Sequence, residues 1–120
     1  MKFEHFESNL ERENEYPKLV RDNIIEIVEQ RTGKKTKSRI LENDEEFLKF
    51  LLKKIEEESN ELANTKDREH LAEETADIKE ILDTILELNG LDWETIDKIQ
   101  KEKAEKRGGF KKRVLMLEKV

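Results

Sequence analysis

Two stretches with a helical repeat of apolar residues stand on either side of a short turn, and this feature constrains the fold more than any other. The first spans about residues 43–64, where Asn43 can cap a helix and Glu46 stands at the capping-box position. The sequence NTKD makes the turn, and the second stretch spans about residues 68–89, with Gly90 as a typical C-terminal stop. We therefore predict a hairpin of two antiparallel amphipathic helices.

Two shorter helices flank this hairpin. We predict one over about residues 21–31 and another over about residues 92–107, before the glycine pair of an RGG sequence. Residues 113–120 lack helical amphipathicity and predict a short strand or an extended tail, for which residues 36–41 are a candidate strand partner. No repeat or long linker divides the chain, so residues 1–120 form one predicted domain, an all-α four-helix bundle.

The composition favours an oligomer and argues against several classes of protein. Charged residues make up 45% of the chain and apolar residues 34%, so a lone monomer has little material for a core. The net charge of -6, with both signs mixed, gives no basic face for nucleic acid. The N-terminal sequence MKFEHFESNL has no signal-peptide run, and no apolar run is long enough for a membrane helix. We expect a cytoplasmic, soluble homo-oligomer.

Acidic residues interrupt the apolar stripe of the second predicted helix. At about 100° per residue, with Leu51 as the stripe centre, Glu58 lies about 20° away. Glu61 lies about 80° away on the same helix, whereas Glu57 lies about 120° away, towards solvent or a rim. Two carboxylates thus lean towards the core where apolar side chains are expected.

The third predicted helix repeats this arrangement. With Ile78 as the centre of its stripe, Glu74 lies about 40° away and Asp77 about 100° away, on the same side. The hairpin would bring Glu58 and Glu61 to the same place, and four partly buried anions need a positive partner. Because all the ligands are oxygen atoms, magnesium or manganese is the predicted cation.

More ordinary explanations stay open at this point. In a chain rich in charge, an acidic side chain beside an apolar stripe is often solvated or one end of a salt bridge. Lys54, about 60° from the stripe centre, can supply the positive charge of an ion-pair network, and is otherwise a candidate substrate contact. His70, about 80° from the stripe of its helix, is as a lone histidine more typical of a structural or exposed position than of a ligand.

Basic residues take over the apolar stripe of the fourth predicted helix. With Ile96 as the centre, Lys103 and Arg107 each lie about 20° away. Such side chains can snorkel and favour the helix dipole, but next to a bound metal a basic pair suits a polyphosphate. Lys18 and Arg21, near the start of the first helix, are weaker candidates for phosphate contacts.

These motifs together resemble a known family, the all-alpha nucleoside triphosphate pyrophosphohydrolases of the MazG-like group. The Glu-Glu-x-x-Glu sequence at 57–61 and the Glu-x-x-Asp sequence at 74–77 are similar to its acidic signature. YPKLVRDNI at 16–24 resembles the start of one branch, and KAEKRGGF at 103–110 resembles its ending. The similarity extends over about residues 16–117, and Ile25, where that branch usually has proline, departs from it only at the helix start.

The resemblance implies hydrolysis of the alpha-beta phosphoanhydride bond of a nucleoside triphosphate, which releases a nucleoside monophosphate and pyrophosphate. It implies a homodimer or homotetramer and a role in nucleotide-pool housekeeping. Phosphoribosyl-ATP pyrophosphohydrolase of histidine biosynthesis and a noncatalytic helical interaction module are the alternatives. The residues that it implies are Glu58, Glu61, Glu74 and Asp77 for magnesium, Lys103 and Arg107 with Lys18 and Arg21 for phosphate, and Glu57 to orient or deprotonate the water.

Overall fold

The computed structural model describes residues 16–120, and over this range the chain is helical without any strand. The all-α class predicted from the sequence is therefore confirmed. None of the helices in this range has the length and apolar character needed to cross a lipid bilayer. The sequence MKFEHFESNL lies outside the described residues. The four helices are α2 (Ile24–Thr32), α3 (Asp44–Ala63), α4 (Arg68–Leu88) and α5 (Trp93–Arg107).

Side-chain caps set the start of the three longer helices. The Asn43 side chain accepts a hydrogen bond from the Glu46 backbone amide (3.0 Å) at the start of α3, as the sequence predicts. Asp67 caps α4 in the same way (2.8 Å), and Asp92 caps α5 (2.9 Å). The predicted limits of these helices agree with the structure to within about two residues. The first helix begins at Ile24, three residues later than predicted.

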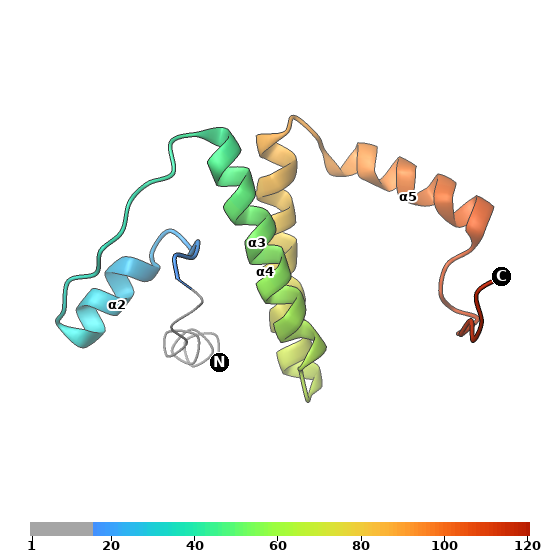
Figure 1. Cartoon of the computed structure of the whole chain (residues 1–120), viewed down its shortest axis with the longest axis horizontal. Coiled ribbons are helices and arrows are strands. Elements are labelled where there is room, and N and C mark those ends of the chain that lie inside the picture. Colours follow the sequence, from blue (N-terminus) through green and yellow to red (C-terminus); the bar gives the residue numbers. More distant parts are fainter. Residues whose placement is uncertain (1–15) are drawn as a thin grey trace.

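Helices α3 and α4 form the predicted antiparallel hairpin, and they lie side by side along their whole length (Figure 1). The turn between them spans only residues 64–67, which forces the two helices to return along each other. Leu51 lies on the inner side of α3, and it is the one apolar residue among the described ones that is fully buried (3% exposed). The hairpin therefore determines the positions of the side chains that lie between α3 and α4.

The four helices do not close into a bundle within one chain, which differs from the prediction. Helices α2 and α5 extend away from opposite sides of the hairpin (Figure 1), and α3 with α4 is the one extensively packed pair among the described helices. The Cα radius of gyration is 17.8 Å. A compact domain of this length has a radius of about 13–14 Å. The single chain is thus too open to bury a shared core.

The C-terminal tail does not form a strand, which was one of its two predicted conformations. Residues 108–120 contain no strand, and all of their side chains are exposed. The candidate partner, residues 36–41, lies in the connection between α2 and α3, on the opposite side of the hairpin from the tail (Figure 1). The two segments are therefore too far apart to pair within one chain.

Candidate metal centre

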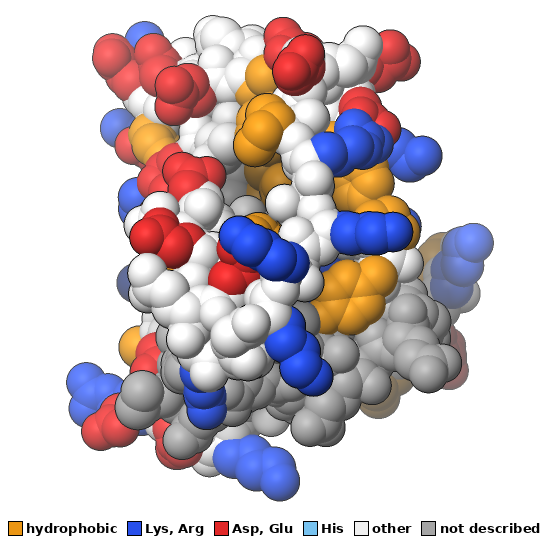
Figure 2. All heavy atoms as spheres, turned by 90° about the vertical axis from the view of Figure 1, so that its left-hand side faces the viewer, with side chains coloured by type: hydrophobic (Ala, Val, Ile, Leu, Met, Phe, Trp, Pro, Cys, Tyr) orange, Lys and Arg blue, Asp and Glu red, His pale blue; other side chains and the backbone are white. Residues whose placement is uncertain are grey.

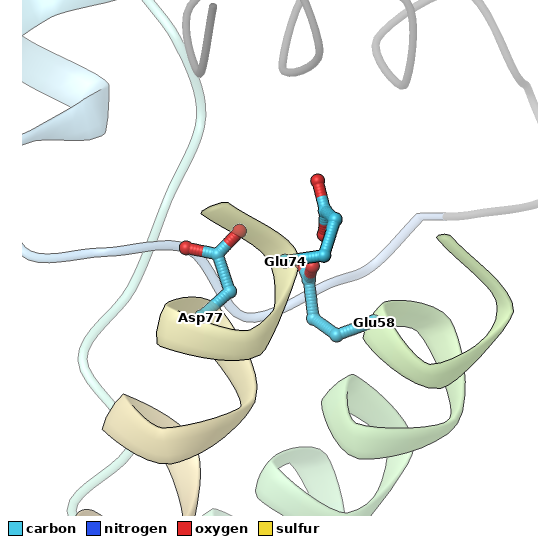
Figure 3. A group of neighbouring side chains, drawn as sticks. All are labelled: Glu58, Glu74 and Asp77. Atoms are coloured by element: carbon cyan, nitrogen blue, oxygen red, sulfur yellow. The ribbon is translucent and has the colours of Figure 1, made fainter. Parts of the chain in front are cut away.

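Three carboxylates from the two helices of the hairpin come together. Glu58 of α3 and Glu74 and Asp77 of α4 are 4%, 1% and 4% exposed. One oxygen of each lies within 4.8 Å of the others. Figure 3 shows the three side chains extending into the same space from facing turns of the two helices. Three of the four acidic residues predicted to converge on one spot therefore do so.

The short turn explains why these side chains meet. Glu58 precedes the turn at 64–67 by about the same number of residues as Glu74 follows it, so the two lie at the same height on antiparallel helices. Asp77 lies one helical turn beyond Glu74 on α4. Because Glu58 also falls on the same stripe as Leu51, it faces α4 and becomes buried with it.

Glu61 lies on α3, one turn nearer the loop, and is partly exposed. It is not among the carboxylates that converge within 4.8 Å in the described part of the chain. The helical angles placed Glu61 closer to the apolar stripe than Asp77, yet Asp77 is the more buried residue. Arg21 in the segment before α2 bonds to Asp77, which brings that segment to the Asp77 side of the hairpin.

That segment, residues 16–23, brings two cations to the carboxylates. Arg21 donates a hydrogen bond from Nη2 to Oδ1 of Asp77 (2.9 Å), and its Nη1 lies 3.5 Å from Oε1 of Glu80. The Lys18 side chain is 4% exposed, and its Nζ lies 3.9 Å from Oε1 of Glu57. The same Nζ lies 5.3 Å from the centre of the Tyr16 ring, which gives it a cation–π contact.

A third cation comes from α3 itself. Lys54 Nζ lies 3.1 Å from Oε1 of Glu57 and 3.8 Å from Oε1 of Glu58. The ion-pair network that the sequence left open is therefore present beside the three carboxylates. Lys18, Lys54 and Arg21 supply three positive charges. Among the described residues they face five carboxylates in direct contact with them or with one another, Glu57, Glu58, Glu74, Asp77 and Glu80.

The oxygen spacing fits a shared divalent cation. Magnesium holds its oxygen ligands at about 2.0–2.1 Å and calcium at about 2.3–2.6 Å, so opposite ligands lie about 4–5 Å apart. The three carboxylate oxygens lie within 4.8 Å of one another, which falls in that range. His70 adds a neighbouring nitrogen, since its Nε2 lies 3.5 Å from Oε1 of Glu74. The His70 side chain is partly exposed.

Lys103 and Arg107 do not reach this group within one chain. Both lie on α5 with exposed side chains, and α5 points away from the hairpin (Figure 1). The direction of α5 depends on a contact at its start, where the Trp93 indole donates a hydrogen bond to Oδ1 of Asp83 on α4 (2.6 Å). The sequence periodicity describes the face of α5 but carries no information about this contact.

Two neighbours of the site were not anticipated from the sequence, the Glu80 contact of Arg21 and the Tyr16 ring beside Lys18. Glu80 lies one turn beyond Asp77 on the same face of α4, and this spacing was the available signal. Comparison of the chain with protein-family models, with curated proteins and with solved structures gives no match. The chemistry of the site must therefore be inferred from its own residues.

Proposed function

We propose that this chain is a magnesium-dependent nucleoside triphosphate pyrophosphohydrolase, which releases a nucleoside monophosphate and pyrophosphate. The observation that carries the proposal is the buried group of Glu58, Glu74 and Asp77. The sequence resemblance described above supplies the substrate class, and the basic residues around the group agree with a polyphosphate. The biological role that follows is nucleotide-pool housekeeping.

The buried group is suited to a hard divalent cation, either magnesium or manganese. Burying several carboxylates costs several kcal/mol per ion unless positive charge accompanies them. Glu58, Glu74 and Asp77 would hold the ion, and Glu61 lies one turn away on α3 to complete the set. A bound ion of this kind neutralises phosphate oxygens and orients them and a water molecule for in-line displacement.

The neighbouring basic residues would bind the phosphate chain. Lys18, Lys54 and Arg21 place positive charge beside the carboxylates, where the alpha phosphate would lie. The Arg21 side chain is 49% exposed, so it can turn from Asp77 towards a phosphate oxygen without leaving a buried cavity. A planar guanidinium matches phosphate oxygens well.

Glu57 is the residue proposed to accept the proton of the attacking water. In this step the water oxygen bonds to the alpha phosphorus, and the bond from that phosphorus to the alpha-beta bridging oxygen breaks. Pyrophosphate leaves with the bridging oxygen, while the water proton passes to the Glu57 carboxylate. Glu57 is 17% exposed at its side chain and lies 3.1 Å from Lys54, so it borders the site and still meets solvent.

The proposal includes assembly as a homodimer or homotetramer. Lys103 and Arg107 would stabilise the leaving pyrophosphate, as the resemblance implies, and they reach a site only if α5 of a neighbouring copy brings them there.

A noncatalytic helical interaction module is the second candidate. It is favoured by the ion pairs of Lys54 and Arg21, which already oppose part of the buried negative charge.

Pyrophosphate release from a panel of nucleoside triphosphates and phosphoribosyl-ATP tests this function. We expect release with magnesium or manganese, and loss of that release in Glu57→Gln and Glu58→Gln, which keep the side-chain shape. Glu73→Gln, an exposed acid next to Glu74, is the matched control and should retain full activity. If no nucleotide is hydrolysed and magnesium leaves the unfolding temperature unchanged, the noncatalytic module is the better account.

A further inference from the structure

Every described helix leaves a large apolar side chain uncovered. Ile27 of α2 is 40% exposed, Leu52 of α3 50%, Leu71 of α4 47% and Ile99 of α5 47%. On the side of the molecule nearest α2, apolar side chains lie open among acidic and basic ones (Figure 2). An amphipathic helix that keeps its apolar side in water gains little from folding, so these faces call for a partner surface.

The amount of uncovered surface is large enough for an obligate interface. The chain exposes 10792 Å². A compact monomer of this length exposes about 6,800 Å². The difference, about 4,000 Å², exceeds the roughly 1,000–2,500 Å² that each partner buries in obligate dimers. This excess includes the extended connections and the C-terminal tail as well as the helix faces, and it leaves enough area for an interface of that size.

Helix α3 also carries a wider apolar arc than one neighbour can cover. Its apolar positions from Phe50 round to Leu52 span about 200° of the helix. A helix with a single packing face has a stripe of roughly 100°. Because α4 is the one described helix packed extensively on α3, part of this arc stays open, as the exposure of Leu52 shows. The hairpin is thus built for a second layer of helices.

The joint between α4 and α5 holds α5 away from its own hairpin. Gly90 adopts a left-handed backbone conformation (φ 66°), and the Leu91 amide donates to the Leu86 carbonyl oxygen (2.9 Å). The Trp93 indole then bonds Asp83 and lies beneath the Lys79 ammonium, 5.7 Å from the ring centre. These contacts fix where α5 begins. The helix is about 22 Å long, so its far end cannot fold back without breaking them.

Charge identifies what α5 would meet. The basic arm, residues 98–113, holds eight lysine and arginine residues and two glutamates, a net charge of +6. The hairpin, residues 44–88, holds 15 acidic and six basic residues, a net charge of -9. Segments of opposite sign attract and orient each other across an interface. Among the described segments, the hairpin is the one with an opposite net charge, and the joint holds the basic arm away from the hairpin of its own chain, so the arm matches the hairpin of another copy.

We propose that α5 packs its Ile96 and Ile99 face on the α3–α4 hairpin of a second copy, with the basic arm against the partner's acidic residues. Each copy would then cover part of the open arc of the other, which explains why neither chain buries a core alone. This inference specifies the interface of the homo-oligomer proposed above. It stands or falls independently of the hydrolytic reaction, because it concerns packing and not the carboxylate group.

Isotope mixing distinguishes packing between chains from packing within one chain. Chains labelled with nitrogen-14 and nitrogen-15 are unfolded and refolded together, with a photo-crosslinking benzoylphenylalanine at position 99. We expect cross-linked peptides that join position 99 to residues 44–88, about half of them with mixed isotopes. The same group at Asp97, about 160° round the helix and outside the basic arm, is the control and should give few such peptides. Cross-links to the hairpin without mixed isotopes would overturn the proposal in favour of packing within one chain.

Sedimentation of matched variants supplies the second test. We expect the parent to sediment as a dimer or larger at micromolar concentration, and Ile96→Gln with Ile99→Gln to weaken association at least tenfold. Glutamine is as good a helix former as isoleucine, so α5 itself should persist, which circular dichroism checks. The control, Glu94→Gln with Asp97→Asn, changes the opposite face outside the basic arm and should associate at least as tightly as the parent at the same ionic strength. A monomeric parent, or equal association of all three proteins, would overturn the proposal.

Discussion

Arg21 and Asp77 are 56 residues apart in the sequence, and a 2.9 Å hydrogen bond joins them. This contact ties the segment before α2 to the middle of α4, and it lies at the edge of the buried carboxylate group. Asp77 is 4% exposed, so the acidic partner in this hydrogen bond is nearly fully buried. The segment before α2 is therefore attached to the buried carboxylate group by a direct hydrogen bond.

Replacing Arg21 with methionine should lower the stability of the metal-free protein. Asp77 would lose its charged partner, but Arg21 is half exposed, so we expect a modest loss of about 1 kcal/mol in the free energy of unfolding. Urea unfolding in buffer with a chelator measures it. Arg68→Met, at an exposed arginine on α4, is the control and should change stability by less than about 0.5 kcal/mol. Equal effects of the two substitutions would show that the Asp77 contact has no special weight.

The buried carboxylates should bind magnesium or manganese. Calorimetry on Glu58→Gln and Asp77→Asn should show that each variant binds the ion at least about tenfold more weakly than the parent. Each change removes one charged ligand and keeps the shape of the side chain. Glu73→Gln, which alters an exposed acid beside Glu74, should bind the ion like the parent. If both buried-site variants bind as tightly as the parent, the ion binds elsewhere or not at all.

Filling the stripe with an apolar residue should separate stability from function. Glu58→Leu places leucine on the stripe that contains Leu51, and Lys54 keeps Glu57 as its partner at 3.1 Å. We expect the free energy of unfolding to stay the same or rise by about 1–2 kcal/mol, since buried ion pairs are often no better than apolar packing. Pyrophosphate release should be abolished. A marked loss of stability in metal-free buffer would instead identify Glu58 as part of a structural salt bridge.

The sequence predicts the hairpin and most of the carboxylate group because both follow from local rules. Helical periodicity places Glu58 and Glu74 on facing stripes, and the cap at Asn43 with a four-residue turn fixes the register between them. Contacts between residues that are far apart in the sequence are harder to predict. Arg21 bonds to Asp77 across 56 residues, and Trp93 at the start of α5 bonds to Asp83 of α4. Neither contact leaves a periodic pattern in the sequence.

The contact between Trp93 and Asp83 should respond to acid. The hydrogen bond from the Trp93 indole, with further support from Lys79, lowers the pKa of Asp83 below its ordinary value of about 3.8. A pKa lower in the folded than in the unfolded state means that the ionised carboxylate stabilises the joint above about pH 3.8 and loses this effect as the pH falls through the lowered pKa. Fluorescence of the single tryptophan should therefore change with a midpoint below pH 3.8.

Asp83→Asn is the control for this titration, because it keeps the shape of the side chain and removes the titrating group. The fluorescence change assigned to Asp83 should disappear in this variant. A midpoint at or above the ordinary value of about 3.8 in the parent would contradict the role given to the indole hydrogen bond.

Product analysis in oxygen-18 water tests the proposed reaction, the hydrolysis of the alpha-beta bond of a nucleoside triphosphate at this site. The reaction is run with the preferred nucleotide and magnesium, and both products are examined by mass spectrometry. Attack at the alpha phosphorus places the label in the nucleoside monophosphate, and we predict that one labelled oxygen appears there while pyrophosphate stays unlabelled. Label mainly in pyrophosphate, or orthophosphate as the first product, would contradict the proposed reaction.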